Sequence, residues 1–202
     1  MNKSAKKIIT SITFVLLLAY AASLYADGVY DREKASNDID WPFREYALYG
    51  SWHVQCSLHF TPPKYKSRTC ELRYTDGSKD NSGRYETFGT SPVVEINALG
   101  DRPPYLLIKM GYIYSNKGNY EASFEVDGKK FEKVVPRSAS YRGWHNSEAV
   151  PVINSFISGN VAKYDYVANP GRIEDTVSLK GFTNAWNHAV KFTGYDPLST
   201  GS

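Results

Sequence analysis

Residues 120–135 read YEASFEVDGKKFEKVV, and the first seven of them alternate apolar with polar side chains. Tyr, Ala, Phe and Val occupy the even-numbered positions from 120 to 126, with Glu and Ser between them. A period of two is typical of a β-strand that buries one face. Asp127-Gly128 follows, and a second run begins at Lys129. Asp-Gly between two such runs predicts a β-hairpin, because both turn positions need positive φ.

The same period recurs before this hairpin. Trp52, Val54 and Cys56 alternate with polar residues, and the alternation resumes at Cys70 after a loop with consecutive prolines at 62 and 63. Prolines cannot join a hydrogen-bond ladder, so the loop separates two neighbouring strands. We expect further strands within residues 85–99, 105–114, 161–167 and 172–179, where apolar and β-branched side chains gather.

Two helices are expected in the C-terminal half of the chain. Pro151 suits a first helical turn, the apolar residues between 152 and 157 form one face, and Gly159 ends the helix. Phe182, Ala185, Trp186 and Ala189 fall at i, i+3, i+4 and i+7 of a second helix. Many short strands with two helices predict a mainly β fold, an antiparallel β-sandwich with two short peripheral helices.

The first 26 residues are typical of a secretory signal peptide. Lys3, Lys6 and Lys7 precede an apolar run over residues 8–22, and small residues follow up to Ala26. We expect cleavage after Ala26; an uncleaved anchor is the alternative, although the run is short for a membrane span. The other expected parts are a flexible polar leader at 27–47, the β-domain at 48–193 and a tail at 194–202. No second long apolar run follows, so we expect no integral membrane segment in the mature chain.

The charge balance argues against nucleic-acid binding. The chain has 24 Lys and Arg against 21 Asp and Glu, a formal net charge of +3. The first 26 residues hold three lysines and no acid, so the remainder carries 24 − 3 = 21 basic and 21 acidic side chains. A nucleic-acid footprint needs an excess of positive charge, which a neutral mature chain does not have.

Cys56 and Cys70 are the two cysteines of the chain. Export would place them in an oxidising compartment, where an even count predicts a disulfide. A pair of free or redox-active thiols is the alternative. Catalytic pairs usually occur as a close C-x-x-C, and 13 residues separate these two cysteines, so the structural disulfide is favoured.

Three segments together resemble the invasion-associated locus B family. Residues 52–56, WHVQC, with Cys70 to Leu72 resemble its W-x-V-x-C … C-x-L opening, and residues 178–186, SLKGFTNAW, are similar to its closing S-L-K-G-F-x-x-A signature. The hairpin at 126–129 lies where that family has a similar strand pair. The candidate structural motif therefore comprises Trp52, Ser178, Leu179, Gly181, Phe182, Ala185 and Trp186. We expect Leu179, Phe182 and Trp186 to seat the last helix on the sheet, and Gly181 to allow their close approach.

The resemblance implies an exported β-protein of the Gram-negative periplasm or outer envelope, without an established catalytic site and with a weak link to host-cell invasion. The chain departs from the family at one position. Members typically carry a second cysteine pair, whose later cysteine follows a glycine; here Gly143 is kept and Trp144 follows it. The resemblance thus implies a divergent member with one disulfide.

The sequence offers no catalytic or metal-binding motif, and no cofactor is expected. No nucleophile elbow, H-E-x-x-H or phosphate-binding glycine loop occurs. His53, Cys56 and His59 form an H-x-x-C-x-x-H run, but residues three apart on a strand point to opposite faces. A disulfide would also remove Cys56 as a metal ligand.

The aromatic content, 14% of the chain, is the unusual bulk feature. Exposed Tyr and Trp clusters often form binding surfaces. Tyr112, Tyr114, Tyr141 and Trp144 are the candidate surface, together with Tyr105 and Tyr120; the alternative is that these rings only pack in the interior. The sequence identifies neither a ligand nor an oligomeric state.

These features predict an exported, non-enzymatic bacterial envelope protein that binds an envelope or host protein. Two alternatives stay open. A periplasmic chaperone or assembly factor would present an apolar groove or sheet edge to its clients. A secreted enzyme with an unrecognised site would present a cleft that gathers titratable side chains.

Overall fold

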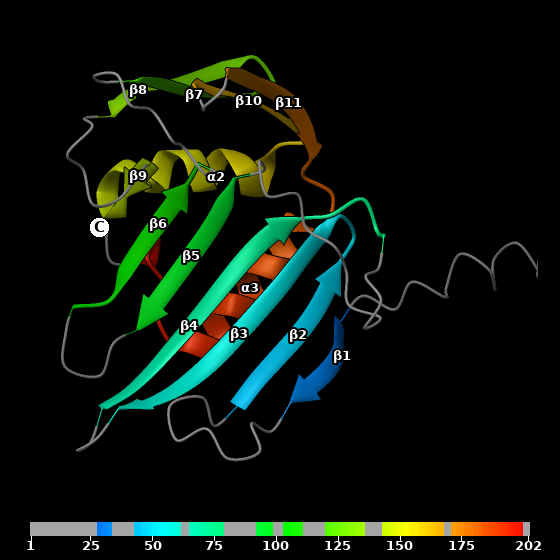
Figure 1. The fold of residues 1–202 in the computed structure, drawn as a ribbon, viewed down its shortest axis with the longest axis vertical. Helices are drawn as coiled ribbons and strands as arrows, with labels where there is room; N and C mark the ends of the chain where they lie inside the picture. The colour runs from blue at the N-terminus through cyan, green and yellow to red at the C-terminus, as the bar shows by residue number, and fades with distance from the viewer. Residues whose placement is uncertain are drawn as a thin grey trace, which may run out of the picture.

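The structure is a computed structural model that describes residues 28–33, 43–61, 65–78, 92–98, 103–110, 120–135, 143–167 and 171–199. These residues form two antiparallel sheets and two α-helices (Figure 1). The strands of the larger sheet are β1 Gly28–Glu33, β2 Phe43–Tyr49, β3 Trp52–Thr61, β4 Tyr65–Tyr74, β5 Val93–Ala98, β6 Tyr105–Lys109 and β9 Gly143–His145. The predicted mainly β, antiparallel fold is confirmed.

The larger sheet, called here the large sheet, has the order β1-β2-β3-β4-β5-β6-β9. Each strand from β1 to β6 pairs with the next along the chain, and β9 returns beside β6. The inner face of its central strands carries the alternating apolar residues predicted from sequence, among them Trp52, Val54, Leu72 and Ile96, each 0% exposed. This face therefore forms one wall of the hydrophobic core.

The second sheet, called here the small sheet, has the order β11-β10-β7-β8. Its strands are β7 Tyr120–Val126, β8 Lys129–Val135, β10 Val161–Val167 and β11 Arg172–Ser178. Asp127 and Gly128 join β7 to β8 with φ values of 45° and 87°, which confirms the predicted hairpin. Ala122, Phe124 and Val126 point to the core, as their period of two requires.

Both predicted helices are present, but they are not peripheral. Helix α2, Val150–Ser158, follows a 3-10 turn, η1 Asn146–Glu148, and lies between the two sheets (Figure 1). Helix α3, Phe182–Thr193, packs against β2 to β5 on the inner face of the large sheet. The apolar face of each helix is buried in the core that the two sheets share. The helices are therefore part of the core rather than packed on the outside of a sandwich.

An aromatic cluster joins the two sheets through α2. The Phe156 ring lies 6.4 Å from Trp52 of the large sheet, 5.3 Å from Phe124 of the small sheet and 5.2 Å from Phe182 of α3, measured between centroids. All three contacts are tilted or edge-to-face, the latter a geometry that aromatic rings prefer. The cluster is therefore the centre of the core.

The predicted flexible leader at 27–47 is wrong where the structure describes it. Strand β1 begins at Gly28 and β2 at Phe43, and the two pair with each other at the edge of the large sheet. The polar residues of this segment suggested a flexible leader, but β1 is an edge strand, where polar residues are common. Glu45, although charged, is buried beneath α3. Residues 194–199 of the predicted tail follow α3, with Pro197 buried. Among the described residues, no helix is long and apolar enough to cross a membrane.

Candidate functional site

Cys56 and Cys70 form a disulfide, as predicted. The two residues are directly opposite each other on β3 and β4, and both are fully buried. The Sγ atom of Cys70 lies 3.8 Å from the Ala189 carbonyl oxygen of α3. The bond therefore fastens the centre of the large sheet under α3, and its burial makes it structural.

The two motif segments, far apart in sequence, meet in space. The indole N–H of Trp52 donates to the Ser178 carbonyl oxygen at 2.9 Å, and the Trp52 ring packs edge-on against Phe182 at 4.8 Å. Leu179, Phe182, Ala185 and Trp186 are all buried. The Ser51 amide also donates to the Lys180 carbonyl at 3.1 Å. The motif residues thus form the joint between the large sheet and α3.

The predicted aromatic surface is wrong at Trp144, the one of its four principal residues that the structure describes, and Tyr105 is half-buried. Trp144 is 4% exposed, and its ring packs 5.0 Å from Phe124 between β9 and the small sheet. It is buried because β9 continues the large sheet and turns Trp144 inward, beside Ile108 of β6. Tyr112, Tyr114 and Tyr141 lie outside the described residues.

Of the two histidines in the H-x-x-C-x-x-H run, the structure describes the side chain of His53, which is buried. It lies on the outer face of the large sheet, and the Tyr46 ring stacks on it at 6.0 Å. Burial, and then the charge of Arg73, lowers the pKa of His53 to about 4. The side chain of His59 lies outside the described residues. Among the described residues, no group of three or more His, Cys, Asp or Glu side chains could hold a metal ion.

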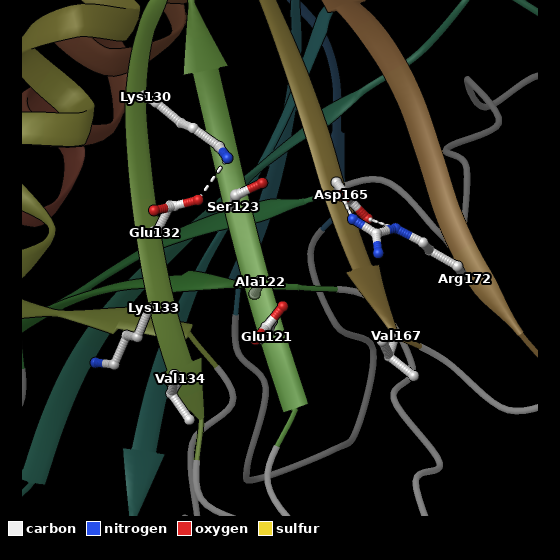
Figure 2. A pocket seen from close by; sticks show the side chains of 10 residues that line it. All are labelled: Glu121, Ala122, Ser123, Lys130, Glu132, Lys133, Val134, Asp165, Val167 and Arg172. Atoms are coloured by element: carbon white, nitrogen blue, oxygen red, sulfur yellow. Dashed lines mark hydrogen bonds and ion pairs between the residues drawn. The ribbon is translucent and has the colours of Figure 1, made fainter.

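Exposed charges gather on the outer face of the small sheet, called here the acidic face (Figure 2). The strand register places its outward residues in three rows that cross β11, β10, β7 and β8. In this order the rows are Thr176, Lys163, Glu125 and Lys130; Glu174, Asp165, Ser123 and Glu132; and Arg172, Val167, Glu121 and Val134. Five carboxylates and three cations give 3 − 5 = −2 charges, whereas residues 27–202 as a whole carry 21 basic and 21 acidic side chains.

A shallow hollow of about 280 Å³ crosses the middle of the acidic face. Arg172 pairs with Asp165 on one side of it and Lys130 pairs with Glu132 on the other (Figure 2). These carboxylates raise the pKa of Arg172 and of Lys130, first through hydrogen bonds and then through charge. Val134 and Val167 remain 59% and 37% exposed at one end. Polar and charged residues of this kind occur at the rim of protein interfaces, around an apolar centre.

A cluster of polar side chains on the outer face of the large sheet is held by hydrogen bonds and ion pairs among its own members. The Tyr105 hydroxyl donates to Glu95 at 2.6 Å, and Lys109 pairs with Glu95 and, at 3.7 Å, with Glu71. Arg73 donates to Glu71 at 2.7 Å. Glu95 of β5 meets two groups of the neighbouring strand β6, whereas Glu71 of β4 meets Arg73 of its own strand and Lys109 of β6, two strands away. The cluster therefore links β4, β5 and β6 on this face.

A second hollow, of about 590 Å³, lies beside α3 and is called here the α3 cleft. His188 of α3 stands between two β2 residues there: its Nε2 lies 3.0 Å from Glu45 Oε1 and its Nδ1 lies 2.9 Å from the Tyr49 hydroxyl oxygen. The sequence alone does not reveal this group of three side chains. The missing signal was the pairing of β2 with β3, which carries Glu45 and Tyr49 to the inner face.

No family model, curated protein or solved structure matches the chain.

Proposed function

We propose that the protein is an exported, non-enzymatic envelope protein, a divergent relative of the invasion-associated locus B family, that binds another protein through the acidic face. The apolar N-terminal run and its three lysines support export. The buried Cys56–Cys70 bond supports an oxidising destination.

The acidic face carries the binding part of the proposal. Five carboxylates with three cations stand on one exposed sheet face, while the mature chain as a whole is neutral in count. Complementary charge steers association and selects partners. The face therefore fits a partner segment with an excess of Lys or Arg, with an aliphatic contact at Val134 and Val167.

Site-specific crosslinking in the native envelope tests this surface. A photoreactive residue at Thr176, which is exposed on the acidic face, should give a discrete adduct with an envelope or host protein. The same residue at Asn184, exposed on α3, is the matched control. Reversal of Glu174 to Lys should abolish the Thr176 adduct, because it removes the net negative charge. Identical adducts at both positions, or an adduct indifferent to Glu174→Lys, would refute the assignment of this face.

Mass measurement of the exported protein tests the rest. Cleavage after Ala26 and a two-hydrogen loss for the disulfide are expected under non-reducing conditions. A full-length chain in the cell interior would contradict the proposed export without touching the binding surface.

A secreted enzyme is the second candidate, because the α3 cleft holds a carboxylate, an imidazole and a phenol in series. A base oriented by a third group and hydrogen-bonded to a hydroxyl is the arrangement of activated nucleophiles. Hydrolysis of a panel of acyl and phosphate esters, measured with the exported protein and with Tyr49→Phe, tests it. Turnover that Tyr49→Phe abolishes would favour the enzyme. By contrast, the Lys130–Glu132 pair on edge strand β8 disfavours a strand-accepting chaperone, since charged edges resist pairing.

A further inference from the structure

The α3 cleft differs in composition from the acidic face and shares no residue with it. One wall is apolar: Val29 of β1, Phe43 of β2, Leu58 of β3 and Phe192 of α3. The Phe43 and Phe192 rings stack with centroids 6.3 Å apart, and Val29 is 40% exposed. A hollow of this size, with an apolar wall and a few convergent polar groups, is typical of sites for small organic ligands.

Two cations line the same cleft, Arg68 of β4 and Lys191 of α3. Both are exposed, and within the described part of the chain neither forms an ion pair with a carboxylate. Glu45, the one carboxylate among the described residues of the lining, is more buried and lies 3.0 Å from His188. The charge left at the mouth of the cleft is therefore positive.

Arg68 is held in position by the end of α3. One guanidinium nitrogen donates to the Phe192 carbonyl oxygen at 3.1 Å, which anchors the group at the C-terminal end of α3. A guanidinium has five N–H donors, so others remain for a second acceptor. Arg binds carboxylates and phosphates through paired hydrogen bonds, and prior fixation of the group reduces the ordering cost on binding.

We propose that the α3 cleft binds an anionic amphiphile, an alkyl chain with a carboxylate or phosphate head. The head lies between Arg68 and Lys191, and the chain lies along Val29, Phe43, Leu58 and Phe192. Neutral alkyl ligands would gain the apolar contact alone, and cationic ones would meet two like charges. The proposal concerns other residues than the acidic face, so either can fail while the other stands.

Calorimetric titration of the full disulfide-bonded chain with decanoate, below its micelle concentration, tests the proposal. Decanol is the matched neutral probe. We expect decanoate to bind about tenfold or more tightly than decanol, the gain typical of a charge-assisted hydrogen bond. Arg68→Gln and Lys191→Gln should each remove most of that difference and leave decanol binding unchanged.

Lys163→Gln is the matched control, because Lys163 is an exposed cation on the acidic face. It should leave decanoate affinity unchanged. Lys191 is exposed and forms no ion pair with the described residues, so Lys191→Gln keeps the test decisive if Arg68→Gln fails to fold. Equal affinity for decanoate and decanol, no binding of decanoate at millimolar concentration, or an equal loss in Lys163→Gln would overturn the proposal. Binding to phosphatidylglycerol vesicles but not to decanoate would also overturn it, since the ligand would then be a membrane surface.

Discussion

Glycine occupies positions 50 and 181, where two turns approach more closely than any side chain permits. A Cβ atom at Gly181 would lie 2.1 Å from the Tyr49 carbonyl oxygen, and one at Gly50 would lie 2.5 Å from the Lys180 carbonyl oxygen. Both residues also have positive φ, 89° and 56°. The Ser51–Lys180 hydrogen bond forms between these turns, so the two glycines let backbone meet backbone at the joint.

Gly181→Ala should therefore destabilise the fold more than the same substitution at a glycine with open space around it. Gly128 is the matched control, because its φ of 87° is nearly the same and nothing lies within 4 Å of its added Cβ. We expect Gly128→Ala to lower the free energy of unfolding by about 1–2 kcal/mol, because alanine is strained in a left-handed conformation. Gly181→Ala should lower it by about 1–3 kcal/mol more, because the added Cβ also clashes with the Tyr49 carbonyl oxygen. Denaturant unfolding of both variants measures this, and equal losses would show that close approach is not the reason for Gly181.

His53 should make stability depend on pH. The folded protein favours the neutral ring, with a pKa of about 4 against an unperturbed value near 6.5. Between these values the unfolded chain binds more protons than the folded one, so stability rises with pH from about 4 to 6.5. The loss on acidification should reach about 3 kcal/mol. His53→Gln should lack this component, and parallel pH profiles for the two proteins would contradict the buried neutral histidine.

At the scale of elements, sequence patterns succeeded where one face is buried and local turn chemistry is strong. The hairpin at Asp127 and both helices begin and end close to the predicted residues. They failed at β1 and β2, because an edge strand is polar and because Glu45 is buried only when His188 of α3 packs over it. The α3 cleft and the acidic face depend on strand pairing between distant segments, which local periodicity does not encode.

Seating of α3 on the large sheet depends on Phe182. Its ring is fully buried, 4.8 Å from Trp52 and 5.2 Å from Phe156, so it contacts both the sheet and α2. Phe182→Ala should cost about 3–5 kcal/mol, the usual range for a buried Phe. Asn184→Ala, exposed two residues further along the same helix, should change stability little. A thermal melt of Phe182→Ala that matched that of Asn184→Ala would refute the seating role.

At the scale of the whole molecule, the two sheets are connected mainly by side chains rather than by shared strands. Strands of the large sheet do not pair with those of the small sheet among the described residues. Phe156 and Trp144 fill the space between them, and Lys133 of β8 pairs with Glu148 of η1 at the rim. The outer face of the small sheet is therefore open to a partner, because the core packs against its inner face. The α3 cleft lies elsewhere, between α3 and the β1–β4 part of the large sheet.

The disulfide should raise the free energy of unfolding of the whole domain, because it lies under α3 at the centre of the large sheet. Its cysteines are 14 positions apart, and closing a loop of that size is worth about 3 kcal/mol in the chain-entropy model. The paired Cys56→Ala and Cys70→Ala variant should lose at least that much, since the removed sulfur atoms also leave voids in a fully buried site. Denaturant unfolding of the oxidised protein, the reduced protein and the double variant separates the two effects. The reduced protein should lose the crosslink contribution alone, and coincident transitions for oxidised and reduced protein would contradict a stabilising bond.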